Sequence, residues 1–320
     1  MTRATSARAA LSAFLLLLGA AAAAHAKEAA TAAVSSLAPS LSLAASGKRA
    51  LTHDRGEPLL LAVDLGNPLA AARREENRTR DRHLRALEKS GVLAKMSPAD
   101  REAAEEGAAP LLLPVFTLGS DDDPVWEVLS VQVRTAAGKP VESRVRPLRS
   151  TTAGAPSVVL DGTGSAPLYF GLDPDALSRL PAGDYWLHVL LDTRGKPDMW
   201  QGIALSQVVT LTLRDGAEGA PEKSDARAGR YYWLDGQYDR VEKIAERMLA
   251  RDPASIDAWT LHADVAAAKG DLTDAEQAYQ LLIRLYVQQH ADDPEPRPPE
   301  FLEQRLRDVQ ALIAAEKPRR

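Results

Sequence analysis

Cysteine is missing from all 320 residues of the chain. Its absence excludes disulfide bonds, thiolate zinc sites, cysteine nucleophiles and a lipid-modified cysteine behind a signal sequence. Hydrophobic residues still make up 45% of the chain, so that burial of apolar side chains alone can build a core. At this length we expect about two domains.

The sequence also lacks the spaced motifs that carry common chemistry. It contains no Gly-x-Ser-x-Gly elbow, Ser-x-x-Lys pair, phosphate loop or His-Glu-x-x-His helix. The neighbours His53 and Asp54 are a weak acid–base signal, because adjacent residues rarely face each other as catalysis requires. The carboxylates at 121–123 could hold calcium, but they lack the spacing of an EF-hand and indicate a solvated turn. We therefore predict no enzyme, no cofactor and no metal site.

Positive charge is not in excess either, since the formal net charge is −5. A mildly acidic chain is not a general nucleic-acid binder. The arginines between residues 73 and 85 alternate with acidic residues, which indicates ion pairs along an exposed helix. We expect no nucleic-acid partner.

One apolar run stands at the N-terminus. Arg3 and Arg8 lead into "AALSAFLLLLGAAAAA", and "AHA" ends at Ala26. This order predicts a cleavable secretory signal peptide over residues 1–26, cleaved after Ala26. The alternative is an uncleaved membrane anchor, but the run is short for a span of roughly 20 residues, and no later stretch could form a transmembrane segment. We therefore expect a periplasmic or secreted protein of the bacterial envelope.

The middle of the chain changes from helical to strand-like patterns. Residues 27–45 are rich in Ala, Ser and Thr and are expected to be a flexible lead-in, within which "LSLAAS" is a candidate strand. Residues 46–215 contain short alternating runs separated by Gly, Pro and Asp, which favour an antiparallel β-sandwich. Two helices capped at Asn67 and Ser97 predict a helical insertion over 68–107.

Two stretches of this region share a family resemblance. "LDPDALSRLPAGDYWLHVLLD" joins a short helical turn to a strand with alternating Tyr185, Leu187, Val189 and Leu191. It resembles the penultimate strand of immunoglobulin-like domains in exported bacterial proteins, and "GEPLLLAVDLGNP" resembles an early strand of them. The resemblance implies an immunoglobulin-like β-sandwich, within an α+β multidomain chain.

After a polar linker at 216–226, the pattern is helical and repeats with a period of 34 residues. The period is that of a helix–turn–helix repeat. This period separates Gly236 from Gly270, and each of these glycines is expected to end a helix with positive φ. The remaining positions that shape the two units over 227–290 are small, aromatic or turn residues: Gly229, Tyr232, Pro253, Trp259, Ala263, Ala275 and Tyr279.

These residues resemble the tetratricopeptide repeat family, and the second unit, "AWTLHADVAAAKGDLTDAEQAYQLLIRL", matches it better. The first unit departs from the family pattern at Asp225, where Trp is usual, and at Val241, where Ala is usual. In the second unit, Val287 stands where the closing proline is usual. An ordinary four-helix arrangement is the alternative. Two repeats alone bury little surface, so residues 291–320 are predicted to be a linker and a C-terminal capping helix. Its apolar stripe is Leu302, Leu306, Val309 and Ile313.

The resemblance to the repeat family implies a groove for a protein or peptide partner. Carried over by position, its lining residues are Arg230, Trp233, Asp257, Thr260 and Asp264. The alternative is that these are solvated helix faces. We predict an exported, non-enzymatic scaffold or adaptor that binds a protein partner in the envelope.

A second hypothesis assigns the function to the β-sandwich. Trp126, Tyr169 and Trp200 could form a face that stacks on sugar rings, although aromatic residues on strands more often pack in a core. The chain would then bind peptidoglycan or another polysaccharide, and the repeats would be structural.

Overall fold

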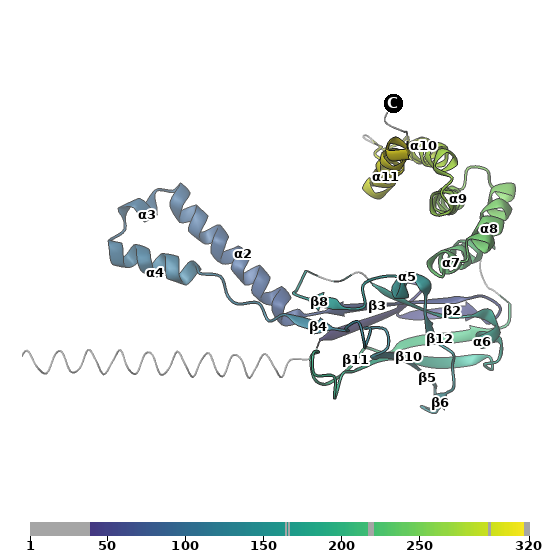
Figure 1. The fold of residues 1–320 in the computed structure, drawn as a ribbon, viewed down its shortest axis with the longest axis horizontal. Coiled ribbons are helices and arrows are strands. Elements are labelled where there is room, and N and C mark those ends of the chain that lie inside the picture. Colours follow the sequence, from purple (N-terminus) through teal and green to yellow (C-terminus); the bar gives the residue numbers. More distant parts are fainter. Residues whose placement is uncertain (1–38, 164, 166, 217–220, 294–295, 317–320) are drawn as a thin grey trace, which may run out of the picture.

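The computed structural model describes residues 39–163, 165, 167–216, 221–293 and 296–316. The predicted signal peptide, residues 1–26, and most of the predicted lead-in lie outside them. Ten helices and several mainly antiparallel sheets in the described residues make this an α+β protein. Figure 1 shows three parts: a β-domain, a helical arm formed by α2–α4, and a helical module formed by α7–α11.

Two sheets of the β-domain face each other across one core. The first has the order β1 (Ser40–Ala45), β3 (Leu59–Gly66), β9 (Leu168–Leu172), β7 (Arg146–Pro147). The second has the order β2 (Ala50–Asp54), β12 (Val209–Arg214), β10 (Gly183–Asp192), β5 (Leu129–Thr135), β6 (Pro140–Val141), with β11 (Ile203–Leu205) also on β10. The short pair β4 (Phe116–Leu118) and β8 (Val158–Leu160) forms a separate two-stranded sheet that packs into the same core. Helices α5 (Arg149–Thr152) and α6 (Pro174–Ser178) lie in connections.

Alternation along the strands explains this core, because successive side chains point to opposite faces. Leu61 and Val63 of β3 are completely buried, as are Leu187 and Val189 of β10. The alternating residues of β10 therefore form its inward face, including Tyr185, whose hydroxyl donates to the Pro181 carbonyl at 2.7 Å.

Two predictions for the β-domain need correction. Strand β1 pairs with β3 over six positions and buries three side chains in the core, so the domain begins at Ser40 and not at residue 46. The expected antiparallel order fails at β2 and β12, which pair in parallel. The chain crosses from the first sheet to the second right after β1, where Ser46 and Gly47 have positive φ. The alternating pattern of a strand does not indicate whether it pairs in parallel or antiparallel with its neighbour.

The helical arm follows its local signals. Helix α2 (Pro68–Lys89) begins after Asn67, whose side chain accepts the Ala70 N–H at 3.0 Å, and α4 (Pro98–Ala108) begins after Ser97 in the same way. Helix α4 runs one residue past the predicted end at Gly107, and the four-residue helix α3 (Val92–Lys95) was not predicted. The arm projects from the β-domain (Figure 1).

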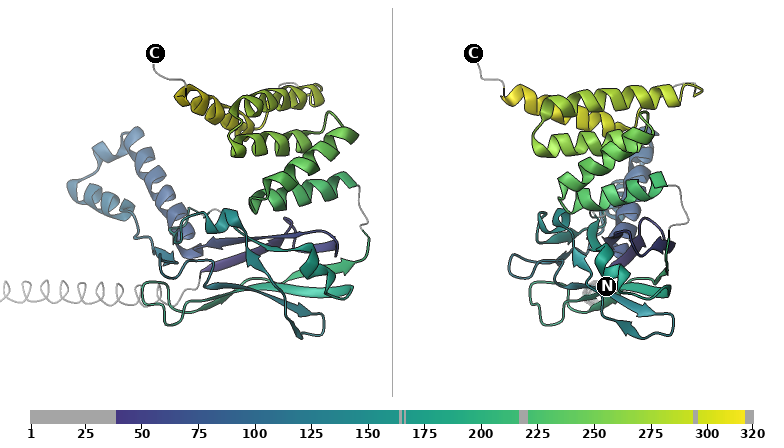
Figure 2. Two further views of the ribbon diagram at one scale, coloured as in Figure 1. Left: turned by 45° about the vertical axis from the view of Figure 1, so that its right-hand side comes forward. Right: turned by 90° about the vertical axis from the view of Figure 1, so that its right-hand side faces the viewer.

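The helical module stacks five helices in chain order (Figure 2). These are α7 (Pro221–Leu234), α8 (Tyr238–Arg251), α9 (Ile256–Lys269), α10 (Leu272–Gln289) and α11 (Glu300–Glu316). Helix α7 starts within the predicted linker at 216–226, which is therefore shorter than expected. In α11, Leu302 and Val309 are buried and Leu306 and Ile313 pack beside them, so the predicted stripe faces α10.

Helix α7 packs on the β-domain. Tyr231 is completely buried there, and its ring lies so close to Gly171 of β9 that a Cβ on this glycine would come within 2.4 Å of Tyr231 Cε2. Leu60 and Tyr169 pack against the same cluster. Across the described residues, no helix has both the length and the apolar character needed to cross a membrane.

Candidate functional site

Arg230 and Trp233, the predicted groove positions on α7, form one unit. Arg230 is exposed, and its guanidinium carbon lies 4.9 Å from the centre of the Trp233 ring. Trp233 is half-buried, and its indole N–H has no hydrogen-bond partner among the described residues. A cation above an indole face is held by the ring quadrupole, so Trp233 positions the exposed Arg230 guanidinium over its ring.

The three predicted positions on α9 differ from one another. Asp257 is exposed, whereas Thr260 is half-buried and its hydroxyl donates to the Ile256 carbonyl at 2.8 Å. The prediction that Asp264 lines an open groove is wrong, because its side chain is only 5% exposed. It accepts the Tyr279 hydroxyl at 2.6 Å and forms an ion pair with Arg305 of α11.

Asp264 therefore holds the C-terminal helix in place and does not line an open groove. A buried carboxylate needs hydrogen-bonded or charged partners, and Tyr279 and Arg305 supply both. Burial, with the adjacent Asp264 carboxylate, raises the pKa of Tyr279, so its hydroxyl remains a donor. Because Arg305 lies 41 residues along the chain from Asp264, no local spacing connects them.

The residues predicted to shape the helix pairs lie at close contacts and turns. A Cβ on Gly229 would come within 2.4 Å of Leu261 Cδ1, so any larger residue where α7 meets α9 would force the Leu261 side chain to shift. Gly236 and Gly270 have φ of 72° and 84°, as predicted for the ends of α7 and α9. Pro253 is exposed in the turn before α9, where its carbonyl accepts the indole N–H of half-buried Trp259 at 2.9 Å. The other four, all buried, are Tyr232, Ala263, Ala275 and Tyr279.

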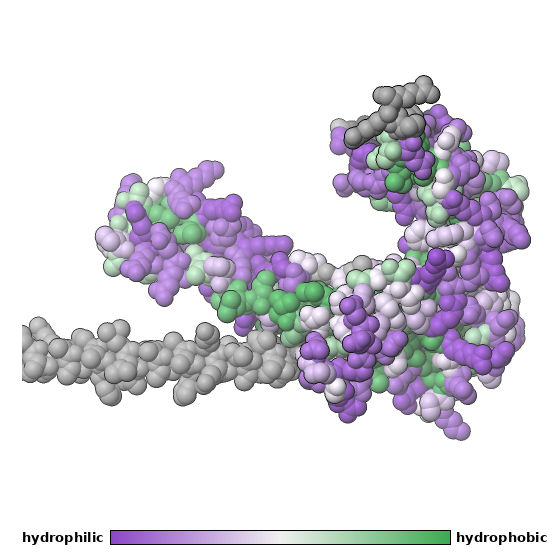
Figure 3. Space-filling model, in the orientation of Figure 1, coloured by the Kyte–Doolittle hydropathy of each residue, from purple (hydrophilic) through white to green (hydrophobic). Residues whose placement is uncertain are grey.

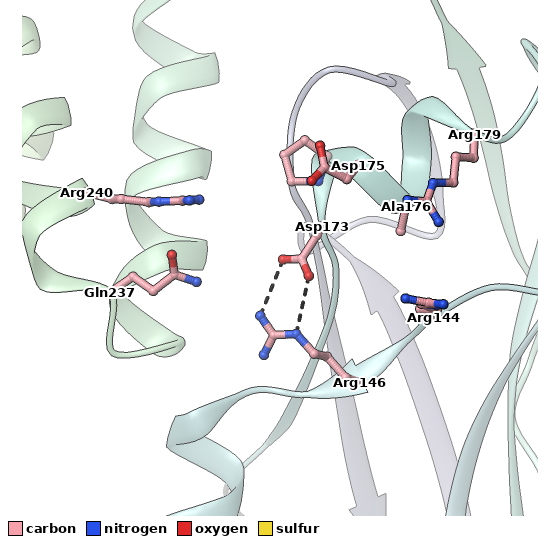
Figure 4. A pocket seen from close by; sticks show the side chains of 9 residues that line it. Arg144, Arg146, Asp173, Asp175, Ala176, Arg179, Gln237 and Arg240 are labelled. Atoms are coloured by element: carbon pink, nitrogen blue, oxygen red, sulfur yellow. Dashed lines mark hydrogen bonds and ion pairs between the residues drawn. The ribbon is translucent and has the colours of Figure 1, made fainter.

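A second site, which the sequence analysis missed, lies where the β-domain meets α8. It is a pocket of about 430 Å³, here called the junction pocket, and Figure 4 shows its side chains. The β-domain contributes Arg144 and Arg146 near β7 and Arg179 after α6. Gln237 and Arg240 extend toward them from the start of α8 (Figure 4).

An ion-pair network forms the wall of the junction pocket. Arg146 donates two hydrogen bonds of 2.7 Å to Asp235 and two longer ones, of 3.3 and 3.4 Å, to Asp173. Although burial alone would raise it, hydrogen bonds from Arg146 and Gln237 hold the pKa of Asp235 below its ordinary value. Burial and the hydrogen bond to Asp173 raise the pKa of Tyr231, which donates to that carboxylate at 2.6 Å. The network joins α7 to the β-domain.

The aromatic residues of the second hypothesis are engaged in packing. Trp126 and Trp200 pack against the β-domain core, and Tyr169 packs under α7. Trp186 differs, because it is 41% exposed on the outer face of β10, with Arg134 and Thr210 as its cross-strand neighbours. The strand alternation around Tyr185 would have placed Trp186 outward.

The described residues contain no group of three or more His, Asp or Glu side chains that could hold a metal ion. Asp123 of the predicted turn pairs with Lys196. His53 is buried and Asp54 is its neighbour on the opposite face of β2, so the two do not form a dyad. Burial lowers the pKa of His53, whose Nε2 lies 3.1 Å from the Glu57 carbonyl oxygen.

A comparison of the chain with models of protein families finds no match, and a comparison with curated proteins finds no relative.

Proposed function

We propose that the chain is an exported, non-enzymatic scaffold that holds a protein partner in the bacterial cell envelope. In this proposal, α7–α10 form two tetratricopeptide-like repeats, and the β-domain is an immunoglobulin-like sandwich that carries them. The partner binds along the exposed residues Arg230 and Asp257, together with the half-buried Trp233 and Thr260.

One observation supports this proposal most strongly: both ends of the helix stack are covered. A stack of two repeats exposes an apolar face at each end, and at least three repeats are usually needed for stability. Here Tyr231 of α7 is buried on the β-domain, and Leu302 of α11 is buried on the other end. The stack can therefore be stable with its lateral surface free, and that surface includes the Arg230–Trp233 pair.

Affinity capture from the envelope of the native host tests the proposal. Three proteins are compared: the full chain, the variant Arg230→Ala/Trp233→Ala, and a chain that ends at residue 215. A partner held by the full chain and lost from the other two supports binding through the helices. Arg284→Ala is the matched control, since Arg284 is exposed on α10. A partner held equally by the truncated chain assigns the function to the β-domain.

The polysaccharide hypothesis retains one observation in its favour, the exposed Trp186 ring with polar neighbours. Aromatic rings of this kind stack on the apolar faces of sugars. Retention of the protein on peptidoglycan, lost on Trp186→Ala but unchanged by Trp233→Ala, would favour this alternative. Absence of retention on a broad glycan panel would remove it.

A further inference from the structure

The junction pocket has positive charges that are not paired with carboxylates in the described part of the chain. Arg144, Arg179 and Arg240 line it, and none of the three forms an ion pair with a carboxylate in the described part of the chain. All three are exposed at its rim. Arg240 is held by stacking, with its guanidinium carbon 5.0 Å from the centre of the Tyr232 ring.

The acidic groups nearby do not neutralise these arginines. Asp173 and Asp235 are engaged with Arg146, and the side chain of Asp235 is only 7% exposed. Asp175 is the one lining carboxylate without a partner among the described residues, so it stands against three unpaired arginines. The network of one arginine and two carboxylates carries a single negative charge, and the pocket with its wall still keeps a net positive charge.

Guanidinium groups suit oxyanions because their planar forks donate paired hydrogen bonds to phosphate or carboxylate oxygens. Here they approach from two sides: Figure 4 shows Arg144 and Arg179 on the β-domain and Arg240 on α8. The volume of about 430 Å³ is in the range of pockets for small organic ligands and exceeds the need of a single inorganic anion.

We propose that the junction pocket binds a small organic or condensed anion that carries two or more phosphate or carboxylate groups. Arg144 and Arg179 contact one end of the anion, and Arg240 and the Gln237 amide contact the other. Because the two sets belong to different parts of the molecule, the anion bridges the β-domain and the helical module. This site is separate from the Arg230–Trp233 surface and does not depend on the proposed partner.

Calorimetric titration of the purified protein with pyrophosphate, with citrate and with a hexa-aspartate peptide tests the proposal. We expect pyrophosphate or citrate to bind with a stoichiometry of one, more weakly as salt is added. Arg144→Ala/Arg179→Ala should weaken binding at least about tenfold, since each removes charge-assisted hydrogen bonds. Arg284→Ala, which removes an exposed arginine from α10, should change nothing.

Both substituted arginines are exposed and make no ion pair among the described residues, so the double variant should keep the melting temperature of the ligand-free protein. The bound anion should raise that temperature in the parent and not in the double variant. Absence of binding at millimolar concentration, or equal binding by parent and double variant, overturns the proposal. Binding of hexa-aspartate alone also overturns it and assigns the pocket to an acidic peptide. Arg230→Ala/Trp233→Ala should leave anion binding intact, so this result is independent of the partner surface.

Discussion

The helical arm and the helical module are built from the same kind of element but are stabilised differently. In the arm, α2 buries only Ala70 and α4 buries no residue, and Figure 3 shows a largely hydrophilic surface. Hydrogen bonds between its side chains and the following segment hold its helices, such as the two in which the Asn77 amide donates to the Leu111 carbonyl and accepts the Leu111 N–H. The module is held by apolar burial in two clusters. Sequence periodicity alone does not distinguish a helix that belongs to a core from one that extends into solvent.

The two parts should differ most in the unfolding free energy that is lost when a leucine is truncated to alanine. Leu282→Ala in α10 removes a completely buried side chain and should cost about 2–5 kcal/mol of unfolding free energy. Leu84→Ala in α2 truncates a half-buried leucine and should cost less than about 1 kcal/mol. Urea denaturation followed by circular dichroism compares them. Equal costs would mean that the arm has a core of its own.

Loss of the ion pair that holds α11 should have the second-largest effect on stability. Asp264→Asn leaves Arg305 without its charged partner and should destabilise the C-terminal end of the module by about 1.5–3 kcal/mol. Amide hydrogen exchange should then become faster in α11, and exchange in the β-domain should stay unchanged. Asp308→Asn, on the exposed side of α11, is the control and should leave the exchange of this helix as it is.

A smaller and purely local effect is expected in the arm. Asn77→Ala removes two hydrogen bonds to Leu111, of 3.0 and 2.7 Å, each worth about 0.5–1.5 kcal/mol. Exchange of the amides at 109–113 should accelerate while the denaturation midpoint of the module stays constant. Loss of module stability in this variant would contradict the independence of the two parts. Arg78→Ala, which removes only an exposed ion pair, is the matched control.

The smallest effect concerns pH at the contact of the β-domain with α7. His53 is buried beside Glu57, which accepts hydrogen bonds from Ser224 and Arg227 of α7. Burial lowers the pKa of His53 below 6.5, so the unfolded chain binds the proton more readily than the folded chain. Stability from this group is complete above 6.5 and is lost as the pH falls below that value.

His53→Gln removes this titration and should flatten the fall in melting temperature between about pH 7.5 and pH 5.5. His83→Gln, on the exposed surface of α2, should leave the fall unchanged. If the parent and His53→Gln lose stability in parallel, other groups are responsible for the acid sensitivity.

Local signals were sufficient for the starts of α2 and α4 and for the glycines that follow α7 and α9. Asn67 before Pro68 and the two glycines Gly236 and Gly270 act within one turn of the chain, so the sequence predicts their conformations directly. The alternation of β10 likewise predicts its inward row. These signals depend on neighbours that the sequence places side by side.

Contacts between distant segments could not be predicted in this way. Asp264 meets Arg305, and Arg146 meets Asp235 from 89 residues away, yet each arginine looks like a solvated surface residue in its own segment. The same holds for Arg144, Arg179 and Arg240, which form one pocket only after α8 is placed beside the β-domain. A strand pattern also contains no direction, so the parallel pairing of β2 with β12 was not predictable.

The surface around Arg230 and Trp233 is the proposed binding site of the protein partner. The most direct measurement places a photo-crosslinking side chain at position 230 in the full chain, in the native host, with the same side chain at position 284 as the control. We predict a discrete protein adduct from position 230 that is absent from position 284 and disappears with Trp233→Ala. Identical adducts from both positions, or none from position 230, would contradict the proposed function.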